Sequence, residues 1–151
     1  MIEGVRVKQL KMICDERGRL MEILRADDSE FIKFGQLYMT TAYPGVVKGW
    51  HYHKKQIDSF AAVRGMIKLV LYDAREKSKT HREVNEFFLG DHNPILVQIP
   101  NFVYHGFKCV SETEAIVINC PTEPYHHKQP DEFRVAHNDP GIPYSWDIQL
   151  K

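Results

Sequence analysis

The chain has 151 residues, with 20 basic and 20 acidic side chains and a formal net charge of zero. This length suits a single core, so we expect one domain over residues 1–151. The balanced charge gives no reason to expect a nucleic-acid or anionic-membrane partner. The apolar runs are only strand-sized and the N-terminus does not resemble a signal peptide, which together predict a cytoplasmic protein. Three widely spaced cysteines fit reduced thiols in the core rather than a disulfide framework.

The chain begins with an alternating pattern over residues 5–13, which predicts an edge strand, and a turn is expected at Gly18. Asp28 or Ser29 can cap a short helix over residues 29–34, which Gly35 would end. From there on, short strand patterns bounded by Gly, Pro, Asn or Asp recur about every ten residues. These strands are expected at 36–43, 46–53, 59–65, 66–74, 83–90, 94–100, 103–111 and 114–120. The pattern predicts an all-β antiparallel barrel or sandwich with one short helix near the N-terminus.

After Cys120 the sequence becomes rich in proline, histidine and acidic residues. Four aromatic side chains in this tail can anchor it to the domain: Tyr125, Phe133, Tyr144 and Trp146. We therefore expect an ordered segment that crosses the domain surface.

The stretch 45–65 concentrates the residues that carry chemistry. In an extended strand His51 and His53 point to the same side, and Asp58 follows after a gap that a hairpin can close over them. His105 begins a strand on a different hairpin, and a barrel wall can bring it close to the other two histidines. Such a group can bind one divalent metal through His51, His53, Asp58 and His105. Alternatively, one histidine acts as a general base that a buried carboxylate orients.

Five motifs, in order, give the chain a family resemblance. They are D-E-R-G-x-x-x-E at 15–22, K-G-W-H-Y at 48–52, D-A-R-x-x-S at 73–78, H-G-F at 105–107 and H-N-D-P at 137–140. Together they resemble the motifs of the dTDP-4-dehydrorhamnose 3,5-epimerases. The resemblance implies a cupin-type jelly-roll barrel that forms homodimers. It also implies an isomerase that inverts centres flanking the 4-keto group of a nucleotide-linked sugar, with no cofactor or metal.

The resemblance also implies roles for residues of the site. His51 matches the catalytic base and Asp139 the carboxylate that pairs with it. His105 matches a histidine near the keto oxygen, and Lys48 stands where an arginine is usual. Donors placed at the developing enolate oxygen make the neighbouring proton easier to remove.

Four residues are expected to bind substrate. Arg17 and Glu22 match residues that contact the nucleotide, and the resemblance implies that they reach the neighbouring subunit's site. Asn119 aligns with the family's tyrosine acid, and an amide cannot donate that proton. Tyr125 and Tyr104 are the nearest tyrosines in sequence that can replace it. The departure predicts proton return that is slower or limited to one carbon.

Two further departures favour a metal. His53 replaces the usual glutamine, and Asp58 aligns with the family's lysine. The resulting spacing resembles the first metal motif of metal-binding cupins, so the alternative hypothesis is a metal-dependent cupin enzyme. A third hypothesis, from another class, is a sugar-nucleotide binding module without catalysis.

Overall fold

The computed structural model describes residues 1–148, and within this range the chain forms twelve β-strands and no helix. The strands are β1 (Arg6–Gln9), β2 (Met12–Asp15), β3 (Gly18–Met21), β4 (Tyr38–Ala42), β5 (Val47–Tyr52), β6 (Asp58–Arg64), β7 (Met66–Asp73), β8 (Val84–Gly90), β9 (Ile95–Ile99), β10 (Val103–Cys109), β11 (Ala115–Asn119) and β12 (Phe133–Arg134). The expected strands from residue 36 onward are all present as β4 to β11.

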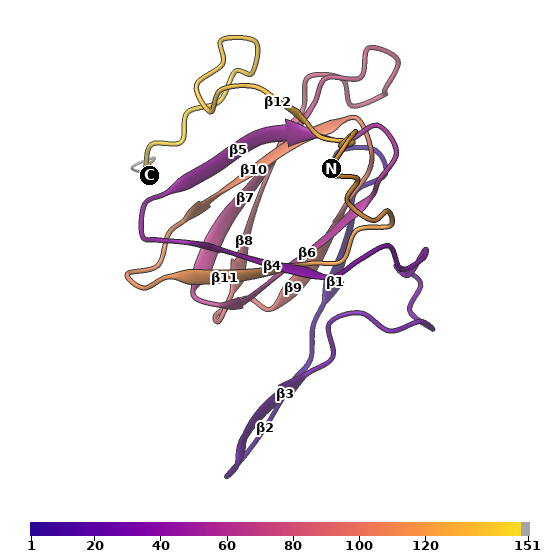
Figure 1. Ribbon diagram of the computed structural model, residues 1–151. Helices are drawn as coiled ribbons and strands as arrows, with labels where there is room; N and C mark the ends of the chain where they lie inside the picture. Colours follow the sequence, from indigo (N-terminus) through magenta and orange to yellow (C-terminus); the bar gives the residue numbers. More distant parts are fainter. Residues whose placement is uncertain (149–151) are drawn as a thin grey trace.

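Two five-stranded antiparallel sheets face each other and form a jelly-roll barrel (Figure 1). The strand order is β1-β9-β6-β11-β4 in the first sheet and β12-β5-β10-β7-β8 in the second. The chain crosses between sheets after β5, so Asp58 does not return on a hairpin as its sequence position suggested. It reaches the histidines from the facing sheet.

The core lies between the sheets because the inward side chains are almost all apolar. Its largest members include Phe60 on β6, Leu69 on β7 and Phe107 on β10, each at most 3% exposed. Burying such side chains contributes about 1.5–3 kcal/mol each. This apolar filling occupies one part of the barrel and leaves the part next to β4 and β5 for polar side chains.

The strands β5 and β10 approach each other closely at two glycines. A Cβ atom built on Gly49 would lie 2.9 Å from Cα of Gly106, closer than real side chains allow. In this region the pairing shifts: His105 lies opposite His51, whereas Phe107 lies opposite Lys48. The step from His105 to Phe107 on β10 is two residues, whereas the matching step between His51 and Lys48 on β5 is three. The extra residue on β5 is a β-bulge. The bulge turns both Lys48 and His51 toward the pocket described below.

The prediction of a short helix over residues 29–34 is wrong. Turns and a bend occupy residues 26–30, and residues 31–37 follow without regular secondary structure. Backbone carbonyls in this segment bind the barrel instead: that of Ser29 accepts from Arg6 Nη1 (3.0 Å) and that of Glu30 from Gln98 Nε2 (2.6 Å). Six residues offer too few internal hydrogen bonds to outweigh these contacts. No helix within residues 1–148 is long and apolar enough to cross a membrane.

Two segments extend the barrel. The β2–β3 hairpin turns at Gly18, whose φ of 138° favours glycine, and projects away from the barrel (Figure 1). The tail crosses the outer face of the second sheet, as the aromatic anchors predicted. Trp146 packs against Trp50 with ring centroids 4.8 Å apart, and Phe133 stacks on Tyr52 at 5.0 Å.

Candidate active site

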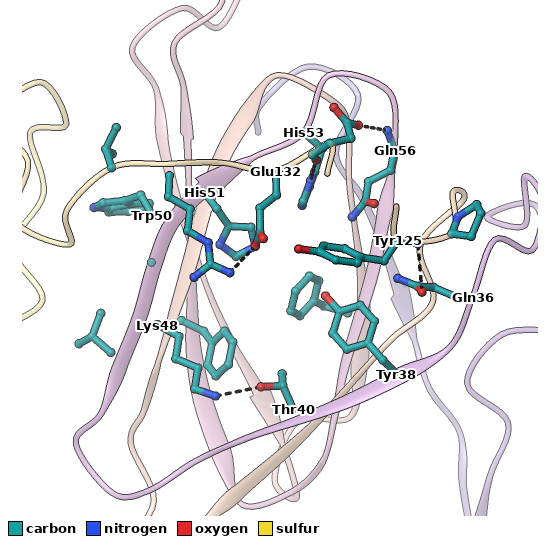
Figure 2. A pocket seen from close by; sticks show the side chains of 18 of the residues that line it. Gln36, Tyr38, Thr40, Lys48, Trp50, His51, His53, Gln56, Tyr125 and Glu132 are labelled. Carbon is teal, nitrogen blue, oxygen red and sulfur yellow. Dashed lines mark hydrogen bonds and ion pairs between the residues drawn. The ribbon is translucent and has the colours of Figure 1, made fainter. Parts of the chain in front are cut away.

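A cavity of about 830 Å³ opens between β4 of the first sheet and β5 of the second (Figure 2). Its wall includes His51 and His53 on one side and Tyr38 on the other, and Tyr125 of the tail projects into it. This volume lies in the range of small-molecule sites, which is about 300–1,000 Å³. We refer to His51, Tyr38, Tyr125 and Lys48 as the pocket wall.

His51 is the histidine of the pocket wall, and its surroundings keep it neutral. It pairs across the sheet with His105, and the centroids of the two rings lie 4.0 Å apart. Burial and the neighbouring imidazole of His105 hold the pKa of His51 well below its ordinary value. The ring is therefore neutral near pH 7, with a lone pair that can accept a proton.

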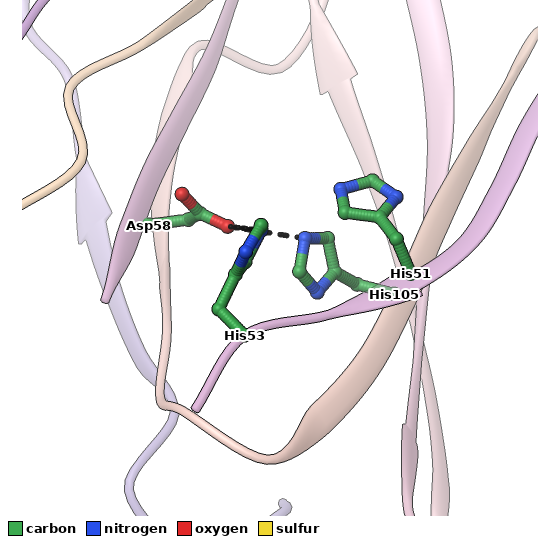
Figure 3. Close-up of side chains that lie close together, drawn as sticks. All are labelled: His51, His53, Asp58 and His105. Carbon is green, nitrogen blue, oxygen red and sulfur yellow. Dashed lines mark ion pairs between the residues drawn. The ribbon is translucent and has the colours of Figure 1, made fainter. Parts of the chain in front are cut away.

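Behind this wall, His53, Asp58 and His105 form a group that we call the buried layer (Figure 3). Asp58 Oδ2 lies 3.2 Å from Nε2 of His53 and 3.1 Å from Nε2 of His105. Asp58 and His105 are at most 2% exposed and His53 is 7% exposed. With His51, they place four ligand atoms within 4.8 Å of one another, so the expected convergence occurs.

Hydrogen bonds from outside hold each member of the buried layer. Asp58 Oδ1 accepts from Gln56 Nε2 and from Asn119 Nδ2, both at 2.8 Å. Nδ1 of His105 lies 3.1 Å from the Val103 carbonyl oxygen, and Nδ1 of His53 binds the Asp131 carbonyl oxygen. The three side chains are therefore fixed in place before any ligand arrives.

The charges of the buried layer depend on one another. Burial raises the pKa of Asp58, but contacts with His105 and His53 outweigh it and leave that pKa far below the ordinary value. For His53, burial lowers the pKa and the carboxylate of Asp58 more than compensates, so the net shift is upward. Asp58 is thus a permanent anion that attracts positive charge into the buried layer.

Sequence reasoning missed Tyr38. It lies on β4 directly opposite Asn119 of β11, and its hydroxyl accepts a hydrogen bond from Asn119 Nδ2 at 2.9 Å. Burial, followed by the charge of Asp58, raises the pKa of Tyr38 to about 12. A protonated hydroxyl therefore faces the pocket from the strand beside the position where a tyrosine was expected. The cross-strand neighbour of Asn119 was the signal that would have identified it.

Asn119 itself does not face the pocket. It is 0% exposed, and its side chain contacts Asp58, Tyr38 and the backbone of Ser59. A direct substrate contact by this amide, as the alignment suggested, is incompatible with this burial. Tyr104 is excluded as well, because it packs against Tyr52 on the outer face of the second sheet, at 4.7 Å between ring centroids.

Charged side chains line the mouth of the pocket. Lys48 donates to Thr40 Oγ1 at 3.0 Å, and Arg134 donates to Glu132 Oε1 at 2.7 Å. The hydroxyl of Tyr125 points toward the centre of the cavity (Figure 2). The expected pocket positions of His51, Lys48 and Tyr125 agree with this geometry, whereas His105 lies one layer deeper.

Three other predicted site residues lie elsewhere within this chain. Asp139 borders a separate hollow beside Tyr104 on the outer face, and its Oδ1 accepts from the Gly141 backbone at 2.8 Å. Within residues 1–148 no hydrogen bond or ion pair joins it to His51. Arg17 pairs with Asp15 at the tip of the projecting hairpin, and Glu22 pairs with Arg25 near its base.

Comparisons with known proteins match the whole chain. A family model described as dTDP-4-dehydrorhamnose 3,5-epimerase covers residues 1–151. The spore coat polysaccharide biosynthesis protein SpsL of Bacillus subtilis (strain 168) is 40% identical over 151 residues, which is 100% of both chains. The probable low-salt glycan biosynthesis epimerase Agl13 of Haloferax volcanii is 39% identical over 151 residues, 99% of this chain and 97% of that protein.

The structural comparison agrees. The crystal structure of a dTDP sugar isomerase from Desulfovibrio desulfuricans G20 has a TM-score of 0.92 and 36% sequence identity, over 96% of this chain and 92% of that one. The resemblance in the five sequence motifs is therefore confirmed at the level of the family and the fold. The chain belongs to the dTDP-4-dehydrorhamnose 3,5-epimerase family of sugar isomerases.

Proposed function

We propose that the protein epimerises a nucleotide-linked 4-keto-6-deoxyhexose by removing and returning a proton on a carbon next to the ketone. The observation that carries this proposal is a neutral histidine, His51, on the wall of a cavity that faces a protonated tyrosine, Tyr38. A base and an acid on facing sheets suit proton removal from one face of a sugar ring and delivery to the other.

His51 is the base. A proton α to a ketone leaves as the enolate forms, so the base must be neutral and accessible from the cavity, and His51 meets both requirements. Lys48 lies on the same strand, and its ammonium group adds positive charge to the side of the cavity where the enolate of the substrate forms. Asp139 borders a separate hollow and makes no hydrogen bond to His51 within residues 1–148, so it does not orient His51 within this chain.

Tyr38 is the acid. Because Asn119 donates to the Tyr38 oxygen, the hydroxyl proton of Tyr38 is free to point into the pocket. The same amide hydrogen bond stabilises the phenolate that remains after the proton leaves. Asn119 thus acts through Tyr38, and the tyrosine acid of this chain comes from β4 rather than from β11.

The mouth of the pocket suits the nucleotide. Arg134 presents a guanidinium, which binds phosphate oxygens. The family and the relative named a dTDP sugar isomerase favour dTDP as the nucleotide. Proton transfer of this kind requires no organic cofactor.

In a homodimer, Arg17 and Glu22 can take the roles predicted for them. The β2–β3 hairpin exposes Ile13 and Leu20, which are 50% and 56% exposed, although it projects away from its own barrel. An apolar hairpin of this kind suits docking on a second copy, where Arg17 would reach the partner's nucleotide. Three free cysteines favour the reducing cytoplasm as the location.

Isotope exchange tests the proposal. The purified protein is incubated with dTDP-4-keto-6-deoxyglucose in heavy water, and deuterium at C3 and C5 is followed by NMR. We expect enzyme-dependent deuterium at one or both carbons. dTDP-glucose, which has no ketone, should gain none. Binding of the keto sugar without any exchange would contradict the proposal and favour a non-catalytic binding module.

A further inference from the structure

The buried layer has features that proton transfer at the pocket wall does not use. We propose that His53, Asp58 and His105 bind one divalent first-row transition-metal ion through two imidazole nitrogens and one carboxylate oxygen. This site goes beyond the proposed epimerisation, and its existence does not depend on that activity.

The tautomer of the two histidines favours a bound ion. A backbone carbonyl only accepts hydrogen bonds, so Nδ1 of His53 and Nδ1 of His105 each carry a proton that they donate to Asp131 and Val103. In the neutral rings the lone pairs are therefore on Nε2, the two atoms nearest Asp58. Metal-bound histidines characteristically donate their other ring nitrogen in this way.

The direction of the two Nε2 atoms also favours a bound ion. Both Nε2 atoms lie 3.1–3.2 Å from Asp58 Oδ2, yet within residues 1–148 neither makes an aligned hydrogen bond. Two buried ring nitrogens without an aligned partner are costly in a protein interior. Ligands bonded at about 2.0–2.2 Å to one ion lie about 3–3.5 Å apart and aim at the ion rather than at one another. The observed spacing and misalignment both match this arrangement.

The hydrogen bonds that support the carboxylate of Asp58 also favour a bound ion. Asp58 uses Oδ1 to accept from Gln56 and Asn119, which leaves Oδ2 directed at the two histidines. One protonated histidine would also balance the charge of Asp58. However, a ring proton lies along the Nε2 axis, and that axis does not meet Oδ2 at hydrogen-bond geometry. One cation between the three atoms satisfies all of them together.

The ligand types restrict the ion. Imidazole nitrogen favours zinc, iron, nickel, cobalt or copper, whereas magnesium and calcium prefer sites made only of oxygen. His51 belongs to the same cluster but differs from the other histidines. It lines the cavity, and within residues 1–148 no hydrogen bond fixes its ring. We therefore assign it to the pocket side, where it remains available as the base.

Metal binding can be measured directly on the full chain purified without a histidine tag. The protein is stripped with a chelator and titrated with Zn²⁺ by calorimetry and with Co²⁺ by visible absorption. We expect one equivalent of Zn²⁺ per chain and cobalt d–d bands of a site with nitrogen and oxygen ligands. Failure of the folded protein to bind either ion stoichiometrically at micromolar concentration would overturn the proposal.

Variants locate the site. His53→Gln and His105→Gln should lose stoichiometric binding, and Asn119→Ala, which removes support for Asp58, should weaken it about tenfold to a hundredfold. The matched control is His126→Gln, because His126 is an exposed histidine outside the cluster and should bind as the wild type does. Unchanged affinity in both ligand variants, or loss of the ion in His51→Asn, would overturn the three-residue assignment.

A second measurement tests the proposal without the ligand variants, so it holds even where those variants fail to fold. Zn²⁺ should raise the Tm of the stripped wild type and of His126→Gln equally, since an ion that binds only the folded state stabilises it. No rise in either protein would contradict the proposal. Isotope exchange by the stripped protein bears on the epimerase proposal alone, so the two proposals can fail separately.

Discussion

The buried layer and the pocket wall lie side by side but are built differently. In the buried layer, hydrogen bonds fix all three side chains: Gln56 and Asn119 donate to Asp58, and the two histidines donate to backbone carbonyls. On the pocket wall, the ring of His51 has no such partner within residues 1–148, and Lys48 reaches only the hydroxyl of Thr40. The buried layer is therefore organised in advance, whereas the pocket wall keeps its polar groups available for a substrate.

Tyr38 connects the two regions and should show the largest effect. Tyr38→Phe removes the proposed acid, and we expect the rate of sugar inversion to fall about a hundredfold to ten-thousandfold. Exchange at the carbon that His51 deprotonates should persist, because removal of the proton does not use the acid. NMR of product and deuterium content measures both rates on one sample.

The matched control is Tyr125→Phe, which changes a hydroxyl that also points into the pocket (Figure 2). If Tyr125→Phe abolishes inversion and Tyr38→Phe does not, the acid belongs to the tail and the role given to Tyr38 is wrong.

Substitution of Asp58 tests how much the buried layer contributes to the free energy of unfolding. Asp58→Ala removes a buried carboxylate from two histidines, and breaking such a buried group costs about 3–5 kcal/mol of unfolding free energy. Lys48→Ala on the pocket wall should change the same quantity by less than about 0.5 kcal/mol. Urea denaturation measures both. Equal effects of the two substitutions would remove the distinction between the regions.

The hairpin outside the barrel should contribute only through a second subunit. Arg17→Ala should weaken dTDP binding about tenfold to a hundredfold, the usual value of a hydrogen bond to a charged group. The protein should remain a dimer by light scattering. A monomeric wild type, or unchanged affinity in the variant, would contradict the role proposed for the hairpin.

The pH dependence should reflect the pocket wall. Because the pKa of His51 lies well below 6.5, the base stays neutral as the pH falls through that value, and activity is lost only in more acidic solution. Tyr38, with a pKa raised to about 12, stays protonated through pH 10. The pH profile of kcat/KM checks this, and an acid-side midpoint at or above 6.5 would contradict it.

The sequence was sufficient for the barrel and for the convergence of the four chemical side chains. Alternating strands and punctuating turns depend on local pattern, so β4 to β11 could be predicted. The bulge at Gly49 could not be, because it requires the close approach of Gly106 from another strand. For the same reason, the alternation rule alone does not show that Lys48 and His51 share the pocket.

Roles that depend on pairing across strands were harder to predict. Tyr38 is paired with Asn119 only through the register of β4 and β11, and no local pattern contains that register. Asp139 was matched to a motif, but the path of the tail carries it to the outer face. The short helix failed because the barrel, rather than the segment itself, supplies partners for its backbone.

The central claim is that His51 removes the proton next to the ketone. The most direct measurement compares deuterium exchange into dTDP-4-keto-6-deoxyglucose by the wild type and by His51→Asn, at equal occupancy of the nucleotide site. We predict that the variant binds dTDP as the wild type does and that its exchange rate falls about a hundredfold to ten-thousandfold at both carbons. Exchange at the wild-type rate by folded His51→Asn would contradict the claim.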